Sequence, residues 1–279
     1  MTITRSLESA IAEIDGVRFT IDLRSPHSLA IALDFNEVQP RWFAAPPARS
    51  APLASGSFSG RVKSGASCNC STVTLTPHLD GTHTECAGHL TLEKMDAREV
   101  VPVGLLKALV VSVTPTPADR TDESSRPAPR AGDLLITGAA LQRAWPAKLP
   151  FTPQALIVRT LPNANLKRAR DYRSAPAAFL SLPAASLLVA RGIEHLVLDV
   201  PSADRAVDGG ELSAHREFFG LPTGSVALAA ASRPQCTITE LAYIDDVVTD
   251  GVYLMSLQIP AFGGDAVPSR PLLFPVYAA

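Results

Sequence analysis

The sequence predicts an α/β fold: a single compact domain with a strand-rich mixed core flanked by helices. The chain has 279 residues, of which 46% are hydrophobic and 19% charged, a composition typical of one large globular domain. Short β-branched or leucine-rich runs bounded by glycine and proline outnumber the helical patterns. We therefore expect residues 1–279 to form one domain in which the sheet dominates the core.

In the first part of the chain, apolar spacing predicts a short amphipathic helix at residues 8–14, and alternation predicts a strand at 17–23. Segment 44–60 is rich in Pro, Ala, Ser and Gly and is expected to be a loop. A second alternating run predicts a half-buried strand at 70–75.

Segment 114–131 combines prolines with mixed charges, which is typical of a surface excursion or of a linker. Residues 180–191 carry apolar side chains at helical spacing, and Gly192 follows them at a plausible end of the helix. Further buried strands are predicted at 105–113, 133–136, 155–159 and 195–200.

The charge of the chain argues against several classes of partner. A net charge of -2 and a pI near 6.3 provide no basic surface for nucleic acid or for an anionic membrane. No apolar run approaches the ~18 residues needed to span a bilayer, and residues 1–15 lack the apolar region of a secretory signal. We expect a cytoplasmic protein with reduced cysteines, whose partners are a small-molecule substrate and copies of itself.

Three of the six histidines fall within the stretch HLDGTHTECAGH, residues 78–89. In an extended segment, His83 and Glu85 point to one face because side chains alternate, so an imidazole and a carboxylate can converge on one cation. His89 lies too far along a straight strand to join them unless the chain turns at residues 87–88, where Gly88 permits a turn.

Two other interpretations of this stretch stay open. The histidines could cap turns and bond backbone groups, as isolated histidines usually do. A zinc ribbon could use the thiolates of Cys68, Cys70 and Cys86, but their spacing is short and Cys236 stands alone, so no second pair follows.

The same stretch resembles the motif of the metal-dependent cyclase family, whose best-known members are the bacterial kynurenine formamidases. The family has a Gly-Thr-His core, a carboxylate two residues later and a histidine four residues further, matched here by His83, Glu85 and His89. Segments 22–26, 132–138 and 198–204 resemble family strands in the same order.

The resemblance implies a swivelling β/β/α, cyclase-like fold, assembly as a homodimer or homotetramer, and one or two Zn²⁺ or Mn²⁺ ions per chain. It also implies that Glu85 bridges the metals. The sequence departs from the family where Glu85 replaces aspartate, Leu79 occupies the place of the first histidine, and Ala87 replaces proline. The metal ligands implied by the resemblance are His78, His83, Glu85, His215 and Glu240.

We therefore expect a metal-dependent amide hydrolase, similar to the arylformamidases (kynurenine formamidases) of tryptophan catabolism. Metal-activated water would attack an amide or formamide bond, with His89 as general acid and base. The basic run Lys167, Arg168, Arg170 and Arg173 could receive a substrate carboxylate or form a solvated face. Aromatic substrate contacts are expected from Trp42, Phe43, Tyr172 and Phe179, with core packing as the alternative.

Other functions remain as alternatives. The fold could serve a non-catalytic metal- or small-molecule-binding protein, or a hydrolase of lactones or cyclic amides. Ser202 and Asp204 suggest a serine hydrolase, but no Gly-x-Ser-x-Gly elbow surrounds that serine.

Overall fold

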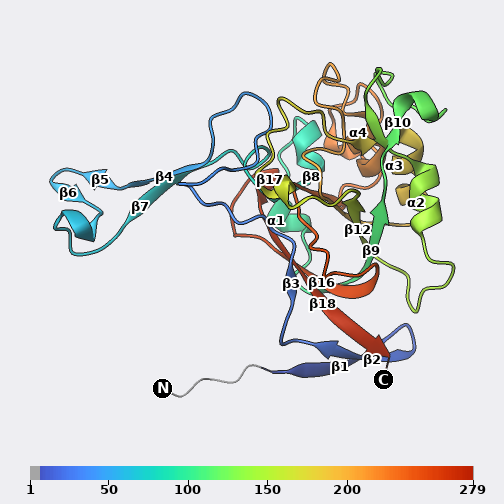
Figure 1. Cartoon of the computed structure of the whole chain (residues 1–279), viewed down its shortest axis with the longest axis horizontal. Coiled ribbons are helices and arrows are strands. Elements are labelled where there is room, and N and C mark those ends of the chain that lie inside the picture. Colours follow the sequence, from blue (N-terminus) through green and yellow to red (C-terminus); the bar gives the residue numbers. More distant parts are fainter. Residues whose placement is uncertain (1–6, 279) are drawn as a thin grey trace.

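The computed structural model describes residues 7–278 and shows a mixed α/β fold built on one large sheet (Figure 1). The sheet has 11 strands in the order β1-β2-β18-β16-β9-β12-β14-β15-β8-β17, and β3 pairs with β18. They are β1 (Ser9–Ile14), β2 (Val17–Asp22), β3 (His27–Ser28), β8 (His83–Cys86), β9 (Leu105–Val113), β12 (Ala155–Thr160), β14 (His195–Leu198), β15 (Thr237–Glu240), β16 (Gly251–Gln258), β17 (Ala266–Pro268) and β18 (Arg270–Ala278).

The centre of the sheet is parallel, from β9 through β12 and β14 to β15. Every residue of β12, β14 and β15 is buried, as expected for strands covered on both faces. The strands predicted at 105–113, 155–159 and 195–200 are confirmed by β9, β12 and β14. The outer neighbours β8, β16, β17 and β18 run antiparallel to the strands beside them.

Two apolar layers cover the two faces of this sheet. On one face Leu109 and Leu156 contact the helices through a core that includes Leu188. On the other face Val110 and Ile157 pack in a second core. The helices are α1 (Ala97–Val100), α2 (Gly138–Ala144), α3 (Leu182–Ala190) and α4 (Ser213–Phe219), and α2, α3 and α4 gather on one side of the molecule (Figure 1).

The helix predicted at 180–191 is confirmed by α3. The Ser181 hydroxyl accepts a hydrogen bond from the Ala184 N–H at the start of the helix (3.0 Å). Gly192, with φ 72°, follows its end. None of the helices among residues 7–278 is both long enough and apolar enough to cross a membrane.

The helix predicted at 8–14 is wrong, because these residues form β1 and pair with β2. Asp15 and Gly16 join the two strands, and both have positive φ (49° and 80°). An Asp-Gly pair with two positive φ angles makes the tight turn that matches the twist of a hairpin. This local turn overrides the weak helical spacing of the segment.

The loop predicted at 44–60 is only partly correct, because the segment contributes strands to a two-part arm that projects from the body (Figure 1). All of β7 is exposed, so the predicted strand at 70–75 exists but is not half-buried. It pairs with β4, and the two strands form a separate two-stranded sheet. The arm comprises β4 (Arg49–Pro52) paired with β7 (Ser71–Thr74), and β5 (Ala54–Ser55) paired with β6 (Phe58–Ser59).

Segment 114–131 runs along the surface and includes β10 (Thr116–Pro117), which pairs with β11 (Leu134–Ile136). The Glu123 carboxylate accepts hydrogen bonds from two N–H groups at the start of α2 and from the Ser181 hydroxyl. A small second sheet is completed by β13 (Phe179–Leu180). The short 3₁₀ helices are η1 (Val62–Ser64), η2 (Ala87–Leu90), η3 (Ala118–Arg120), η4 (Asn165–Ala169) and η5 (Leu228–Ala230).

Candidate metal centre

Strand β8 carries the centre of the predicted motif and lies between β15 and β17. His83 pairs with Glu240 of β15, and Glu85 pairs with Ala266 of β17. Alternation along β8 turns His83 and Glu85 toward the same face, as the sequence predicts. The pairing of β15 with β8 also brings Glu240 to that face.

Four side chains, here called the inner cluster, meet beside β8: His83, Glu85, His215 and Glu240. Their exposed fractions are 0%, 1%, 1% and 4%. His215 Nε2 lies 2.7 Å from Glu85 Oε1 and 3.3 Å from Glu240 Oε1, and His83 Nε2 lies 3.5 Å from Glu240 Oε2. The structure therefore joins residues from segments that are far apart in the chain.

Hydrogen bonds fix how both histidines present their rings. The Nδ1–H of His83 donates to the Gly81 carbonyl (3.0 Å), and the Nδ1–H of His215 donates to Asp204 Oδ2 (2.7 Å). Each ring then has its second nitrogen, Nε2, toward the carboxylates of the inner cluster. Metal-binding histidines are usually oriented in this way, by a carbonyl or carboxylate on the other nitrogen.

Two buried atoms of the inner cluster lack a hydrogen bond, namely His83 Nε2 and Glu85 Oε1. Glu85 Oε1 is close to His215, but the contact does not have hydrogen-bond geometry. Buried polar atoms without partners are costly, and a cation would satisfy both at once. Imidazole nitrogens and carboxylate oxygens are ligands for Zn²⁺ and Mn²⁺, so the donor set fits a divalent cation.

The charges of the inner cluster support each other. Burial alone would lower the pKa of His215, but the Glu85 charge and the hydrogen bond to Asp204 raise that pKa well above its ordinary value. The pKa of His83 is raised as well, because the contact with Glu240 outweighs burial. Burial would raise the pKa of Glu240, but His215 and His83 hold it below its ordinary value.

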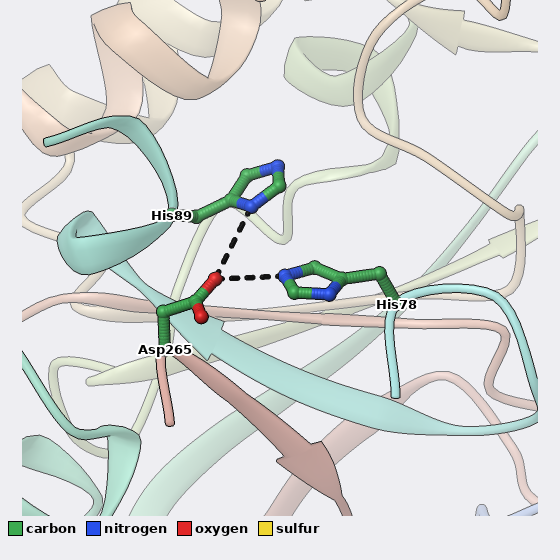
Figure 2. Close-up of side chains that lie close together, drawn as sticks. All are labelled: His78, His89 and Asp265. Carbon is green, nitrogen blue, oxygen red and sulfur yellow. Dashed lines mark hydrogen bonds and ion pairs between the residues drawn. The ribbon is translucent and has the colours of Figure 1, made fainter. Parts of the chain in front are cut away.

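A second group, here called the outer triad, consists of His78, His89 and Asp265 (Figure 2). Asp265 Oδ2 lies 2.9 Å from His78 Nε2 and 3.3 Å from His89 Nδ1. The side chains of the triad are 28%, 27% and 37% exposed, so the triad lies on the solvent side of the buried inner cluster. His78 also lies 3.9 Å from Glu85 Oε2, which links the two groups.

The chain turns after β8, as expected at residues 87–88, because η2 begins at Ala87 and carries His89 back toward the cluster. The ring of His89 is 5.9 Å from that of His215 and 4.5 Å from that of His78. All six residues predicted as ligands or base are therefore brought together, and Asp265 joins them without having been predicted.

Two of the predicted aromatic contacts, Trp42 and Tyr172, are buried and pack with the chain neighbours of two site residues. Trp42 and Tyr172 are packed edge to face at 6.3 Å, in a cluster with Leu241 and Leu79, the chain neighbours of Glu240 and His78. Phe43 lies beside Trp42 and is 45% exposed.

The remaining predicted aromatic contact, Phe179, lies in β13 with 2% exposure. It is among the largest fully buried side chains of the protein. This position favours core packing over contact with a substrate.

The structure also locates the basic run, the Ser202 and Asp204 pair, and the cysteines that the sequence suggested for other functions. Lys167 does not belong to a solvated basic face, because it is buried and its Nζ lies 2.7 Å from Asp199 Oδ2. Asp204 contacts His215, whereas Ser202 only accepts the Asp204 N–H. Cys68 and Cys70 are exposed, and among residues 7–278 neither candidate metal group contains a cysteine.

The chain is similar to known proteins in sequence and in fold. The model of the family described as "Cyclase: Putative cyclase" matches residues 21–205, more than half of the chain. The chain belongs to the cyclase family. The match includes His78, His83, Glu85 and His89, and ends before His215, Glu240 and Asp265. A search of curated proteins finds no match.

Solved structures share the cyclase-family fold at low sequence identity. A predicted metal-dependent hydrolase from Bacillus stearothermophilus has 17% identity and a TM-score of 0.56, over 90% of this chain and 98% of that chain. Isatin hydrolase A from Labrenzia aggregata, bound to benzyl benzoate, has 12% identity and a TM-score of 0.59, over 90% and 93%. A structure described as a novel cyclase has 14% identity and a TM-score of 0.58, over 91% and 89%.

Sequence reasoning missed the roles of Asp204 and Asp265. The sequence indicated Asp204 only as a possible partner of Ser202 in a serine hydrolase. Its contact with His215 depends on how α4 packs. Asp265 is 187 positions from His78 in the sequence, and the pairing of β17 with β8 brings the two residues together. No local sequence pattern predicts this contact.

Proposed function

We propose that this cyclase-family protein is a metal-dependent hydrolase of amide bonds attached to aromatic groups, similar in specificity to kynurenine formamidase. The observation that carries the proposal is the pair of buried atoms without partners, His83 Nε2 and Glu85 Oε1, inside a cluster of imidazoles and carboxylates. The four side chains of the inner cluster would hold the cation, Zn²⁺ or Mn²⁺.

When bound, a divalent cation supplies Lewis-acid activation of water and of the scissile carbonyl. His89 is the proposed general base. It takes a proton from the attacking water as the oxygen bonds to the carbonyl carbon, and it returns that proton to the nitrogen as the C–N bond breaks. Asp204 and the Gly81 carbonyl hold His215 and His83 in the orientation that presents Nε2.

The aromatic residues Trp42, Tyr172 and Phe43 support an aryl substrate. Trp42 and Tyr172 pack with Leu241 and Leu79, which follow Glu240 and His78 in the chain, and the exposed ring of Phe43 lies beside Trp42. Isatin hydrolase A, one of the structural neighbours, is named for the hydrolysis of a cyclic aryl amide. Formyl-aryl amides and fused-ring amides are therefore the two substrates to compare first.

The test uses the zinc- or manganese-loaded protein with N-formylkynurenine and with isatin. We expect turnover of at least one of them by the wild type and by His27→Ala, a control whose histidine lies in β3 outside both groups. His83→Ala should lose both bound metal and turnover. Bound metal without turnover of any amide or lactone would instead support a non-catalytic metal-binding protein.

A further inference from the structure

The backbone of Asp265 is hydrogen-bonded to β8, the strand that carries His83 and Glu85. It directly precedes β17, and its carbonyl accepts a hydrogen bond from the Cys86 N–H of β8 (3.0 Å). The loop before it is anchored where the Gly264 N–H donates to Asp96 Oδ1 (2.8 Å) and the Gly264 carbonyl accepts from the Ala97 N–H (2.8 Å). The backbone of Asp265 is therefore fixed both by the sheet and by the start of α1.

One oxygen of this carboxylate faces two imidazoles. Asp265 Oδ2 lies 2.9 Å from His78 Nε2 and 3.3 Å from His89 Nδ1, and Figure 2 shows both nitrogens directed at it. An ionised carboxylate can only accept hydrogen bonds, so each histidine must present an N–H to it.

This arrangement selects the tautomer of His89. With the proton on Nδ1, Nε2 carries the lone pair, and the neutral ring can accept a proton only there. A general base needs such a lone pair on the side that meets the reacting water. The ring is also restrained by the His78 ring, whose centroid is 4.5 Å away at a tilt of 32°.

The neighbouring glycine fits this close approach. A Cβ on Gly88 would lie 3.2 Å from the Asp265 Cβ and 2.6 Å from the Met95 carbonyl oxygen. The residue before His89 must therefore be small for η2 and the Asp265 loop to come together as they do.

We propose that Asp265 is a positioning residue that fixes His89 in the Nδ1–H tautomer and holds His78 against it. This inference rests on the proposed function, in which His89 moves the proton. It assigns His78 to the outer triad as a partner of Asp265, and it gives a role to a residue outside the segment matched by the family model.

The experiment compares Asp265→Ala and Asp265→Asn with Glu93→Ala in the zinc-loaded protein. Glu93 lines the same cavity of about 500 Å³ as Asp265, but its carboxylate accepts from the Leu228 N–H, so it controls for loss of a nearby charge. Three quantities are measured: zinc content, kcat and KM for the amide that the wild type cleaves, and the tautomer of His89. The tautomer is read from ¹⁵N-histidine NMR spectra at alkaline pH, assigned with His89→Gln.

We expect the wild type and Glu93→Ala to show His89 protonated on Nδ1. Asp265→Ala should keep its zinc and a similar KM, lose about 100-fold or more in kcat, and shift His89 toward a tautomer mixture. Asp265→Asn keeps an acceptor oxygen without the charge, so it should fall between the two.

The proposal is overturned if wild-type His89 carries its proton on Nε2, or if Asp265→Ala changes neither tautomer nor kcat. Loss of zinc from Asp265→Ala also overturns it, because Asp265 would then be a metal ligand. If the wild type cleaves no amide, the proposed function fails, and the tautomer data still decide whether Asp265 positions His89.

Discussion

Glu240 lies directly opposite His83 across the antiparallel ladder between β15 and β8. This pairing places a carboxylate from the last parallel strand 3.5 Å from the imidazole at the start of β8. Strand β8 lies between β15 and β17. Its pairing with β15 also positions Glu85, and its pairing with β17 positions Asp265. The order of the strands thus assembles both groups of the site.

Asp204 should act on the metal through His215. Removal of the carboxylate in Asp204→Ala leaves His215 Nδ1 without its acceptor, and we expect metal affinity to fall about 10- to 100-fold. The carboxylate also accepts from the Ala214 N–H at the start of α4, so the free energy of unfolding should fall by about 1 kcal/mol.

Asp208→Ala is the matched control for this prediction. Asp208 caps the same segment by accepting from the Gly210 and Leu212 N–H groups (2.8 and 2.7 Å). We expect a similar loss of stability with unchanged metal affinity, measured by calorimetric titration. An equal loss of affinity in both variants would show that Asp204 acts only on the fold.

Phe43 and Phe179 should respond in opposite ways to truncation. Phe179→Ala removes a fully buried ring and should cost about 3–5 kcal/mol of unfolding free energy. Phe43→Ala should leave stability nearly unchanged and raise KM for an aryl amide. Denaturant unfolding and steady-state kinetics distinguish the two, and a KM effect confined to Phe179→Ala would reverse our assignment.

Much of the fold could be predicted from local patterns. Continuous apolar runs bounded by Gly and Pro indicated β9, β12 and β14, and helical spacing before Gly192 indicated α3. The first strand was missed because the Asp15-Gly16 turn carries more information than the weak periodicity before it. In the arm, the strand at 70–75 was predicted, but β4, β5 and β6 were missed because they are short and none of their residues is buried.

The candidate site divides in the same way. His83, Glu85 and His89 could be predicted because they lie within one short stretch, where alternation and a turn decide their directions. His215 and Glu240 required the family resemblance, since α4 and β15 meet β8 only in the folded chain. Asp265 depends on a strand pairing that the sequence does not specify locally.

Lys167 and Asp199 form a buried pair whose disruption should be severe. Lys167→Met would leave the Asp199 carboxylate buried without its counter-charge, and we expect a loss of about 3–5 kcal/mol in unfolding free energy. Burial raises the pKa of Asp199 even though Lys167 and Thr160 act to lower it. Arg168→Met, at a half-exposed ion pair, should cost below about 1 kcal/mol. Equal, small losses in both variants would contradict the prediction.

His195 should make the protein less stable in acid. Burial lowers its pKa to about 4, against about 6.5 in the unfolded chain. As the pH falls from about 6.5 to 4, the unfolded state binds a proton that the folded state does not, so stability falls by up to about 3 kcal/mol and then levels off. This step should be missing from the unfolding free energies of His195→Gln. A difference curve between wild type and variant that is flat over this range would rule the effect out.

The central claim is that His83, Glu85, His215 and Glu240 hold a divalent cation. Crystals of the zinc-loaded protein, measured at the zinc absorption edge, test it directly. We predict an anomalous peak among the four side chains, bonded to Nε2 of both histidines. A peak only at the exposed Cys68 and Cys70, or no peak at the inner cluster, would contradict the account.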